Sequence, residues 1–310
     1  MRIIFMGTPA FAVPSLEQLA EAGFRIEAVV TQPDRPRGRG QKLCPSPVKE
    51  KALALGLPVL QPEKVRELEF QARLKELAPD VIAVVAFGQI LPPEILDLPP
   101  LGCINVHASL LPRLRGAAPI QRAILNGDKV TGVTTMYMAP TLDSGDIIFQ
   151  QEEPISEEDT AGTLGERLAR RGAELLVVTL QAVAEGRAPR LRQEEALATY
   201  APPITRAEEM LNWEEPAPSL ARRVRALNPM PGAVTSVGGR PVKIWRARAL
   251  TGYAGGPGQV LAVKGTGGIV VGCGEEALLV EEVQPAGKRS MPAAAFASGY
   301  RVKEGDIWGR

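Results

Sequence analysis

The stretch DVIAVVAFG, residues 80–88, decides the fold of this 310-residue chain. Every side chain from Val81 to Phe87 is apolar, so a strand here has no face suited to water. Such a run predicts a strand that is buried on both faces of a parallel sheet. Gly88 marks the turn that ends it.

The segments around this run alternate between two apolar patterns. Further strands are predicted at residues 2–6, 26–31, 102–107, 133–138 and 146–150, and helices at residues 13–23, 48–55, 65–77, 119–125 and 163–185. Strands that alternate with helices predict a doubly wound α/β domain. We assign it to residues 1–189.

The pattern of apolar residues, prolines and glycines changes in the last third of the chain. Residues 190–207 hold two adjacent prolines and little periodicity, which predicts a linker. A helix at residues 219–226 is followed by short apolar runs that glycines interrupt, at 233–237, 242–247, 259–263, 268–271 and 277–283. Short strands with frequent turns predict a small β-barrel in residues 208–310.

The composition excludes several classes of protein. Hydrophobic residues make up 45% and charged residues 23%, which is typical of a globular protein with a full core. Three scattered cysteines and one histidine predict neither a disulfide framework nor a metal site. The opening residues fit a first strand better than a signal peptide, and no apolar run approaches the roughly 20 residues of a membrane helix. A cytoplasmic location follows as an expectation.

The charge is uneven along the chain. The net charge is +1, yet residues 206–310 hold 14 Lys/Arg against 10 Asp/Glu. A mildly basic C-terminal third fits contact with nucleic acid and equally fits ordinary surface variation.

The single histidine, His107, lies at the end of a predicted strand. Side chains alternate along a strand, so Asn105 and His107 share one face, roughly 6–7 Å apart. That end of a parallel sheet is where ligands bind in open α/β folds. A carboxamide and an imidazolium there can stabilise an oxyanion that develops on a reacting carbonyl. The alternative is a histidine that only fills the core. Cys103 is about 13 Å away in a straight strand, too far for a Cys–His nucleophile pair.

A proton acceptor is predicted in the loop TLDSGD, residues 141–146. Asp143 or Asp146 can reach the same crevice and orient His107, although this composition is also common in plain turns. The residues themselves leave the two aspartates undecided. The first turn, Gly7-Thr8-Pro9, lacks both the dinucleotide fingerprint and the P-loop pattern.

These pieces together resemble the folate-dependent formyltransferases. The resemblance rests on Asn105-Val106-His107, on Ser109-Leu110-Leu111-Pro112, on Arg115-Gly116 and on Leu142 to Asp146. The stretches at residues 6–9, 31–36 and 287–289 are similar to the members that formylate an aminoacylated initiator tRNA. The resemblance covers nearly the whole chain.

The resemblance implies a function and a site. It implies a Rossmann-like N-terminal domain that binds 10-formyltetrahydrofolate as formyl donor, and an OB-like C-terminal barrel that holds tRNA. The reaction implied is formyl transfer to the free α-amino group of methionyl initiator tRNA, giving N-formylmethionyl-tRNA for translation initiation, without a metal. The catalytic residues carried over are Asn105, His107 and Asp143. The folate site carried over comprises Phe87, Gly88, Gln89, Ile90, Ser109, Leu110, Leu111 and Pro112.

A basic loop lies between the second strand and the next helix. The sequence PDRPRGRGQKLCPSP, residues 33–47, holds Arg35, Arg37, Arg39 and Lys42. Four positive charges in eight residues suit phosphate contacts, and we predict that they bind tRNA. A solvated basic insertion is the alternative. Basic residues at 222–225, 243–248 and 288–289 either extend this track or form a solvated face.

Three rival functions share some of these features. A formyltransferase for a small amine would use the same catalytic residues but would not need the arginine loop. A hydrolase would release formate from the same folate without an acceptor amine. A tRNA-binding module with an inactive catalytic domain fits less well, because Asn105, His107 and Asp143 are all present. No membrane and no protein partner is predicted.

Overall fold

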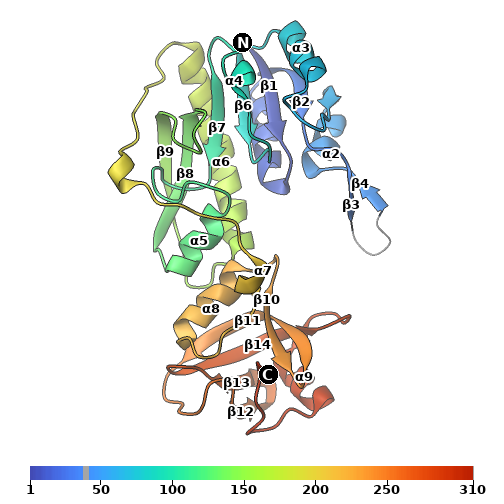
Figure 1. Ribbon diagram of the computed structural model, residues 1–310, viewed down its shortest axis with the longest axis vertical. Coiled ribbons are helices and arrows are strands. Elements are labelled where there is room, and N and C mark those ends of the chain that lie inside the picture. Colours follow the sequence, from blue (N-terminus) through green and yellow to red (C-terminus); the bar gives the residue numbers. More distant parts are fainter. Residues whose placement is uncertain (38–41, 310) are drawn as a thin grey trace. The chain divides into compact units, whose positions relative to one another are not determined.

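The apolar stretch at residues 80–88 forms β6 (Val81–Val85), near the middle of a seven-stranded sheet (Figure 1). The computed structural model describes residues 1–37 and 42–309, without the side chains of Arg37 and Thr266. The chain divides into two units. Unit 1 comprises residues 1–119, 130–154 and 165–201, and unit 2 comprises residues 120–129, 155–164 and 202–310.

Unit 1 is built on a sheet with the strand order β5-β2-β1-β6-β7-β8-β9. The other strands are β1 (Arg2–Gly7), β2 (Arg25–Val30), β5 (Val59–Leu60), β7 (Cys103–His107), β8 (Val130–Tyr137) and β9 (Ile147–Pro154). The pairings from β5 through β7 are parallel, whereas β7–β8 and β8–β9 are antiparallel. The unit is therefore α/β with a mainly parallel, Rossmann-like sheet.

Alternation along the central strands sends side chains into two apolar clusters. Val81 and Val85 lie in one cluster with helix residues such as Leu16 and Leu176, whereas Ile82 lies in the other cluster with Leu74. The helices concerned are α1 (Val13–Glu21), α2 (Pro47–Ala54), α3 (Leu68–Leu77), α4 (Pro93–Leu96) and α6 (Ala161–Ala184). The strand predicted from residues 80–88 is thus buried on both faces.

A short antiparallel hairpin, β3 (Arg35–Arg37) with β4 (Lys42–Cys44), contains the basic loop. Its base is fixed by Asp34, whose carboxylate accepts hydrogen bonds from Lys49 Nζ at 2.7 Å and from Gln61 Nε2 at 2.8 Å. These bonds lower the pKa of Asp34, the one from Lys49 most. Lys49 belongs to α2, so the hairpin is anchored to a helix of the sheet.

Unit 2 holds a β-sheet with the order β10-β11-β14-β13-β12, and β15 pairs with β14. The strands are β10 (Ala233–Val237), β11 (Arg240–Leu250), β12 (Val260–Lys264), β13 (Gly268–Gly272), β14 (Ala277–Pro285) and β15 (Met291–Pro292). The helices are α5 (Pro119–Asn126), α7 (Arg206–Glu209), α8 (Ala217–Ala226) and α9 (Ala293–Tyr300). The C-terminal part of the chain is thus a β-domain with helices packed on its sheet.

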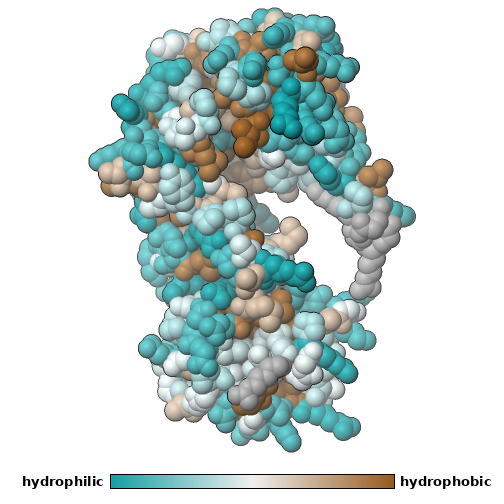
Figure 2. All heavy atoms as spheres, viewed as in Figure 1, coloured by the Kyte–Doolittle hydropathy of each residue, from teal (hydrophilic) through white to brown (hydrophobic). Residues whose placement is uncertain are grey.

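The surface is mainly hydrophilic on the face drawn in Figure 2, with apolar side chains in small separate groups. Within residues 1–37 and 42–309, no helix has the length and apolar character needed to cross a bilayer.

Candidate active site

His107 ends β7, and the sheet fixes where its ring lies. The strand pairs with β6 on one side and with β8 on the other, where His107 is opposite Thr134. Cys103 belongs to one apolar cluster, while Ile104 and Val106 belong to the opposite one. Asn105 and His107 therefore share the face of Cys103, as strand alternation predicts.

The imidazole has an acceptor near each ring nitrogen. Nε2 is 2.9 Å from Leu114 O, and Nδ1 is 3.6 Å from Asp143 Oδ2. A carbonyl oxygen cannot donate, so Nε2 carries a proton. The side chains are 7% and 14% exposed, so this pair meets in a water-poor setting where the attraction between opposite charges is strengthened.

Asp143 is held in an uncommon backbone conformation that aims its carboxylate at His107. Its φ of 46° lies in the left-handed region, which Asp tolerates better than most residues. Oδ2 also accepts the Gly116 N–H at 2.8 Å. Gly116 has a φ of 121°, and a Cβ there would lie 2.8 Å from Ala201 O, so glycine is required for this bond.

Asp146 faces a different partner. Its Oδ2 lies 3.8 Å from Arg190 Nη1, and the guanidinium of Arg190 stacks 3.7 Å from the ring centroid of Tyr137. Asp146 also contributes its carbonyl oxygen to the main-chain bond from Tyr137 N at 2.9 Å. The structure therefore places Asp143, and not Asp146, against the imidazole.

The loop after β7 is shaped by internal bonds. Ser109 Oγ donates to Arg113 O at 2.6 Å, and Leu111 is buried against Met136 and Ile147. Ser109 and Leu111 thus form the interior of this loop. Residues 109–112 contact β8 and β9, since Leu111 N donates to Thr134 Oγ1 at 3.1 Å and Gln150 Nε2 donates to Leu111 O at 2.8 Å.

The loop after β6 turns sharply, with Ala86 at a φ of 47° and Gly88 at 87°. Phe87 is buried and its carbonyl accepts the Thr8 Oγ1 hydroxyl at 2.9 Å. The Gln89 side chain accepts a hydrogen bond from Val65 N at 2.9 Å and donates one to Glu63 O at 3.3 Å. Its amide is thus bonded to the main chain of residues 63–65. Ile90 is 87% exposed. Any ligand contact from Gln89 therefore comes from its main chain.

The predicted tRNA residues lie on the β3–β4 hairpin. Arg35 and Lys42 are exposed, and the register places Arg37 opposite Lys42. Arg39 lies outside the described residues. The three arginines of α8 have other partners within unit 2: Arg222 donates to Leu125 O, Arg223 pairs with Glu215, and Arg225 donates to Asp159 O.

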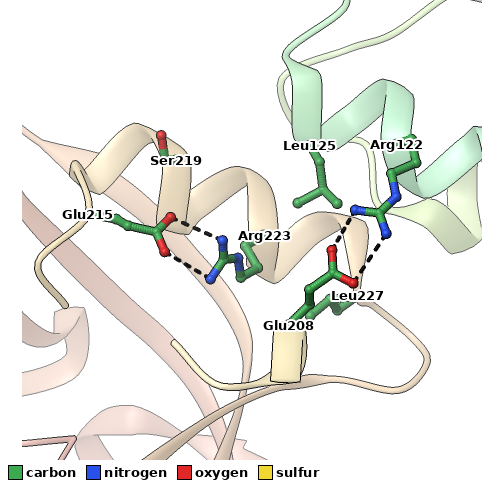
Figure 3. Close-up of a pocket in the computed structure, with 7 residues that line it drawn as sticks. All are labelled: Arg122, Leu125, Glu208, Glu215, Ser219, Arg223 and Leu227. Carbon is green, nitrogen blue, oxygen red and sulfur yellow. Dashed lines mark hydrogen bonds and ion pairs between the residues drawn. The ribbon is translucent and has the colours of Figure 1, made fainter. Parts of the chain in front are cut away.

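A hollow of about 220 Å³ lies within unit 2 (Figure 3). Its lining consists of Arg122, Leu125, Glu208, Glu215, Ser219, Arg223 and Leu227. Arg122 forms two hydrogen bonds with Glu208, and Arg223 pairs in the same way with Glu215. Since the charges cancel in pairs, the pocket offers little attraction for a charged ligand. The Arg122–Glu208 pair joins α5 to α7, and the Arg223–Glu215 pair joins α8 to the segment before it.

Three side chains that support the site carry no local signal in the sequence. Gln193 contacts the loop of Asp143, and Thr134 with Gln150 contacts the loop of residues 109–112. Gln193 lies in the stretch predicted as a linker, and Gln150 is one of two adjacent glutamines at the end of a predicted strand. Only the folded chain brings these side chains to the site.

Comparison with known proteins shows the family of this chain. The family model described as formyl transferase matches residues 1–180, and that for the formyl transferase C-terminal domain matches residues 203–301. Methionyl-tRNA formyltransferase of Moorella thermoacetica is 56% identical over 310 residues, covering 100% of this chain and 99% of the relative. The Bacillus subtilis protein of the same name is 50% identical over 309 residues, covering 99% and 98%.

Solved structures share the fold at low identity. HypX from Aquifex aeolicus, in complex with tetrahydrofolic acid, has a TM-score of 0.68 at 18% identity, and the match covers 97% of this chain but 47% of that longer one. Methionyl-tRNA formyltransferase from Clostridium thermocellum has a TM-score of 0.58 at 18% identity, covering 82% of this chain and 95% of that one.

Proposed function

This chain belongs to the methionyl-tRNA formyltransferase family, and from that premise we propose that it formylates methionyl initiator tRNA. The donor is 10-formyltetrahydrofolate, the acceptor is the free α-amino group of the esterified methionine, and the product is N-formylmethionyl-tRNA for translation initiation. The observation that carries the proposal is the contact between buried His107 and partly buried Asp143, beside Asn105 at the end of β7.

The chemistry needs an oxyanion to be stabilised and a proton to be moved. The amine attacks the formyl carbon, and the carbonyl oxygen gains negative charge. The Asn105 carboxamide donates a hydrogen bond to that oxygen, and the positive charge of a protonated His107 stabilises it. A direct bond from His107 requires that Nε2 leave Leu114 O, its present partner.

Asp143 completes the proton balance. Its carboxylate, which is held by the Gly116 N–H, takes the proton that the attacking amine loses, directly or through water. As the bond between the formyl carbon and the folate nitrogen breaks, Asp143 gives the proton to that nitrogen, directly or through water. The products are then the formylated amine and tetrahydrofolate.

The donor site is proposed to lie between the loops after β6 and β7. Phe87, Gly88, Gln89 and Ile90 would contribute main chain and apolar surface, and Ser109, Leu110, Leu111 and Pro112 the opposite wall. Two observations support this: the loops leave adjacent parallel strands at the ligand-binding edge of the sheet, and the Gln89 amide is already occupied.

The tRNA is proposed to contact Arg35, Arg37, Arg39 and Lys42, and the β-domain is proposed to be an OB-like barrel. The exposed positions of Arg35 and Lys42 support the first proposal. Two bridges support the second proposal: Trp308 pairs with Val237 of edge strand β10, and Ile307 pairs with Gln259, which directly precedes edge strand β12. We propose that residues 1–189 form the catalytic domain, residues 190–207 the linker and residues 208–310 the tRNA-binding domain. We place the enzyme in the cytoplasm, where translation occurs.

The test is formyl transfer by the purified chain. We expect formylmethionyl-tRNA from 10-formyltetrahydrofolate and methionyl initiator tRNA, and a kcat about 10²–10⁴-fold lower in His107→Ala. Formylation of an amino sugar in place of the tRNA, or release of formate without an acceptor, would overturn the proposal in favour of a rival.

The hairpin is tested separately by the salt dependence of tRNA binding. Arg35→Ala with Lys42→Ala should weaken binding and reduce the slope of log K against log[salt] by about 0.7–0.9 for each phosphate that the hairpin no longer neutralises. The matched control is Lys64→Ala with Arg66→Ala, which removes the same charge from exposed positions elsewhere in unit 1. Equal slopes in the two double variants would contradict a role for the hairpin.

A further inference from the structure

Gln193 is a buried polar side chain whose amide is fully engaged at the loop of Asp143. It is 7% exposed. Nε2 donates to Asp143 O and to Gly145 O, each at 2.8 Å. Oε1 accepts from Arg115 Nε at 3.0 Å. Because a guanidinium only donates, Oε1 must face Arg115, and the two amide hydrogens therefore face the two carbonyls.

Arg115 gives this glutamine a rigid support. The arginine is 1% exposed, and its Nη1 and Nη2 donate to the two carboxylate oxygens of Glu195 at 2.9 and 3.0 Å. Its main chain is fixed as well, with N donating to Thr199 O at 2.8 Å and O accepting from Ala201 N at 2.7 Å. Residues 193–201 thus form a brace for the loop that carries Asp143.

The Asp143 loop needs support of this kind. Asp143 itself is in the left-handed region, and a Cβ on Gly145 would lie 1.8 Å from Tyr137 O. The carboxylate is held from one side by Gly116 N, and the main-chain carbonyl is held from the other by Gln193. Gly116 directly follows Arg115, and Gln193 is bonded to Arg115. The same small group of residues therefore holds both the carboxylate and the main-chain carbonyl of Asp143.

We propose that Gln193 is a positioning residue, which holds the Asp143 loop so that the carboxylate stays at His107 Nδ1. Its effect on catalysis rests on the proposed formyl transfer, whereas its effect on the His107–Asp143 contact does not. Gln193 touches neither reacting group and acts through Asp143.

The first test observes His107 directly. Because the chain has one histidine, ring ¹⁵N labelling gives a single Nδ1 and a single Nε2 resonance. In Gln193→Leu, which removes both amide donors, we expect the Nδ1 resonance to move in the same direction as in Asp143→Asn. Gln193→Glu retains an acceptor for Arg115 and should give the same result if the leucine variant fails to fold.

The matched control is Gln71→Leu. Gln71 is also buried and donates its amide to a main-chain carbonyl, Arg66 O at 3.3 Å, but on α3. The Nδ1 resonance should be unchanged in this variant. An Nδ1 resonance in both Gln193 variants that coincides with the wild-type one would overturn the proposal.

The second test is kinetic. Displacement of a catalytic group by about 1 Å costs on the order of 100-fold, so we expect Gln193→Leu to lower kcat by about 10- to 100-fold, with the KM for the folate within about twofold. In an Asp143→Asn background the same change should lower kcat by less than about twofold, because the group it positions is already absent. A full loss in that background would mean that Gln193 acts by another route.

The two proposals fail in different ways. A wild-type protein that makes no formylmethionyl-tRNA would contradict the proposed function. The test by the His107 Nδ1 resonance would remain valid, because it does not depend on activity. A wild-type protein that formylates tRNA, together with an unaffected Nδ1 in the Gln193 variants, would sink only the role of Gln193.

Discussion

At the scale of single residues, the two aspartates of one turn differ in the partner that each carboxylate finds. Asp143 lies 3.6 Å from the imidazole and accepts a main-chain N–H, whereas Asp146 lies beside an exposed arginine. The sequence spacing could identify Asn105 and His107 as neighbours on one strand face, because alternation is a local rule. It could not choose between the aspartates, because the direction of each carboxylate depends on a left-handed backbone and on contacts from distant residues.

The aspartates give a matched pair of variants. Asp143→Asn should lower kcat for formyl transfer by about 10²–10⁴-fold, since it removes the negative charge that supports His107 and accepts the proton. Asp146→Asn should stay within about threefold of wild type, because its loss affects only an ion pair at the surface. Single-turnover rates at saturating folate measure both. Equal losses in the two variants would contradict the assignment.

At the scale of elements, the antiparallel pair β8–β9 supports the loop of residues 109–112. Gln150 Nε2 donates to Leu111 O at 2.8 Å and to Thr134 Oγ1 at 2.9 Å, and Thr134 Oγ1 donates to Ser109 O at 2.6 Å. Two strands of the sheet thus hold the loop that we propose as a wall of the donor site. They pair in the antiparallel direction, which their apolar pattern does not specify.

Removal of this support should appear in the binding of the donor. We expect Gln150→Ala to raise the KM for 10-formyltetrahydrofolate about threefold to tenfold, with a smaller change in kcat, since each hydrogen bond removed is worth about 1 kcal/mol. Glu152→Ala is the control, as it truncates an exposed side chain two residues further along the same strand. A KM shift as large in the control would show that the strand, and not the Gln150 bond, is responsible.

Element boundaries show where local patterns stop being informative. The helix predicted to begin at residue 65 begins at Leu68, because Glu67 before it has an extended backbone with a ψ of 132°. Helix α9 (Ala293–Tyr300) is absent from the sequence prediction, since its alanines and glycine carry little apolar periodicity. The antiparallel direction of β8 and β9 is absent from it too. None of these three features can be predicted from the apolar pattern of a short stretch of sequence.

At the scale of the whole chain, residues far apart in sequence form one ion-pair network in unit 2. Arg122 in α5 binds Glu208, and its guanidinium also donates to Pro202 O and Pro203 O, each at 3.1 Å. The Arg122 bond, followed by the Thr205 N–H, lowers the pKa of Glu208 from 4.5 to about 2.

The stability of unit 2 should therefore depend on pH through Glu208. A carboxyl whose pKa is lower in the folded state stabilises it fully above pH 4.5, and this contribution disappears as the pH falls toward 2. We expect Glu208→Gln to lower the free energy of unfolding by about 1 kcal/mol near neutral pH and by almost nothing near pH 2. The chain's three tryptophans, at positions 213, 245 and 308, all lie in unit 2, so their fluorescence during urea unfolding follows that unit. A difference between wild type and variant that does not change with pH would contradict this account.

Unit 2 is made from three separate stretches of sequence, residues 120–129, 155–164 and 202–310, and this limits how chimeras with relatives can be built. A graft that exchanges residues 203–310 alone would leave Arg122, Leu125 and Asp159 from the host to face a donor helix α8 and a donor Glu208. Recombination libraries that cut the gene once would break these contacts in most progeny. An exchange that transfers residues 120–129 and 155–164 together with the C-terminal portion keeps these contacts between residues of the same parent. The three stretches should therefore be exchanged as one unit.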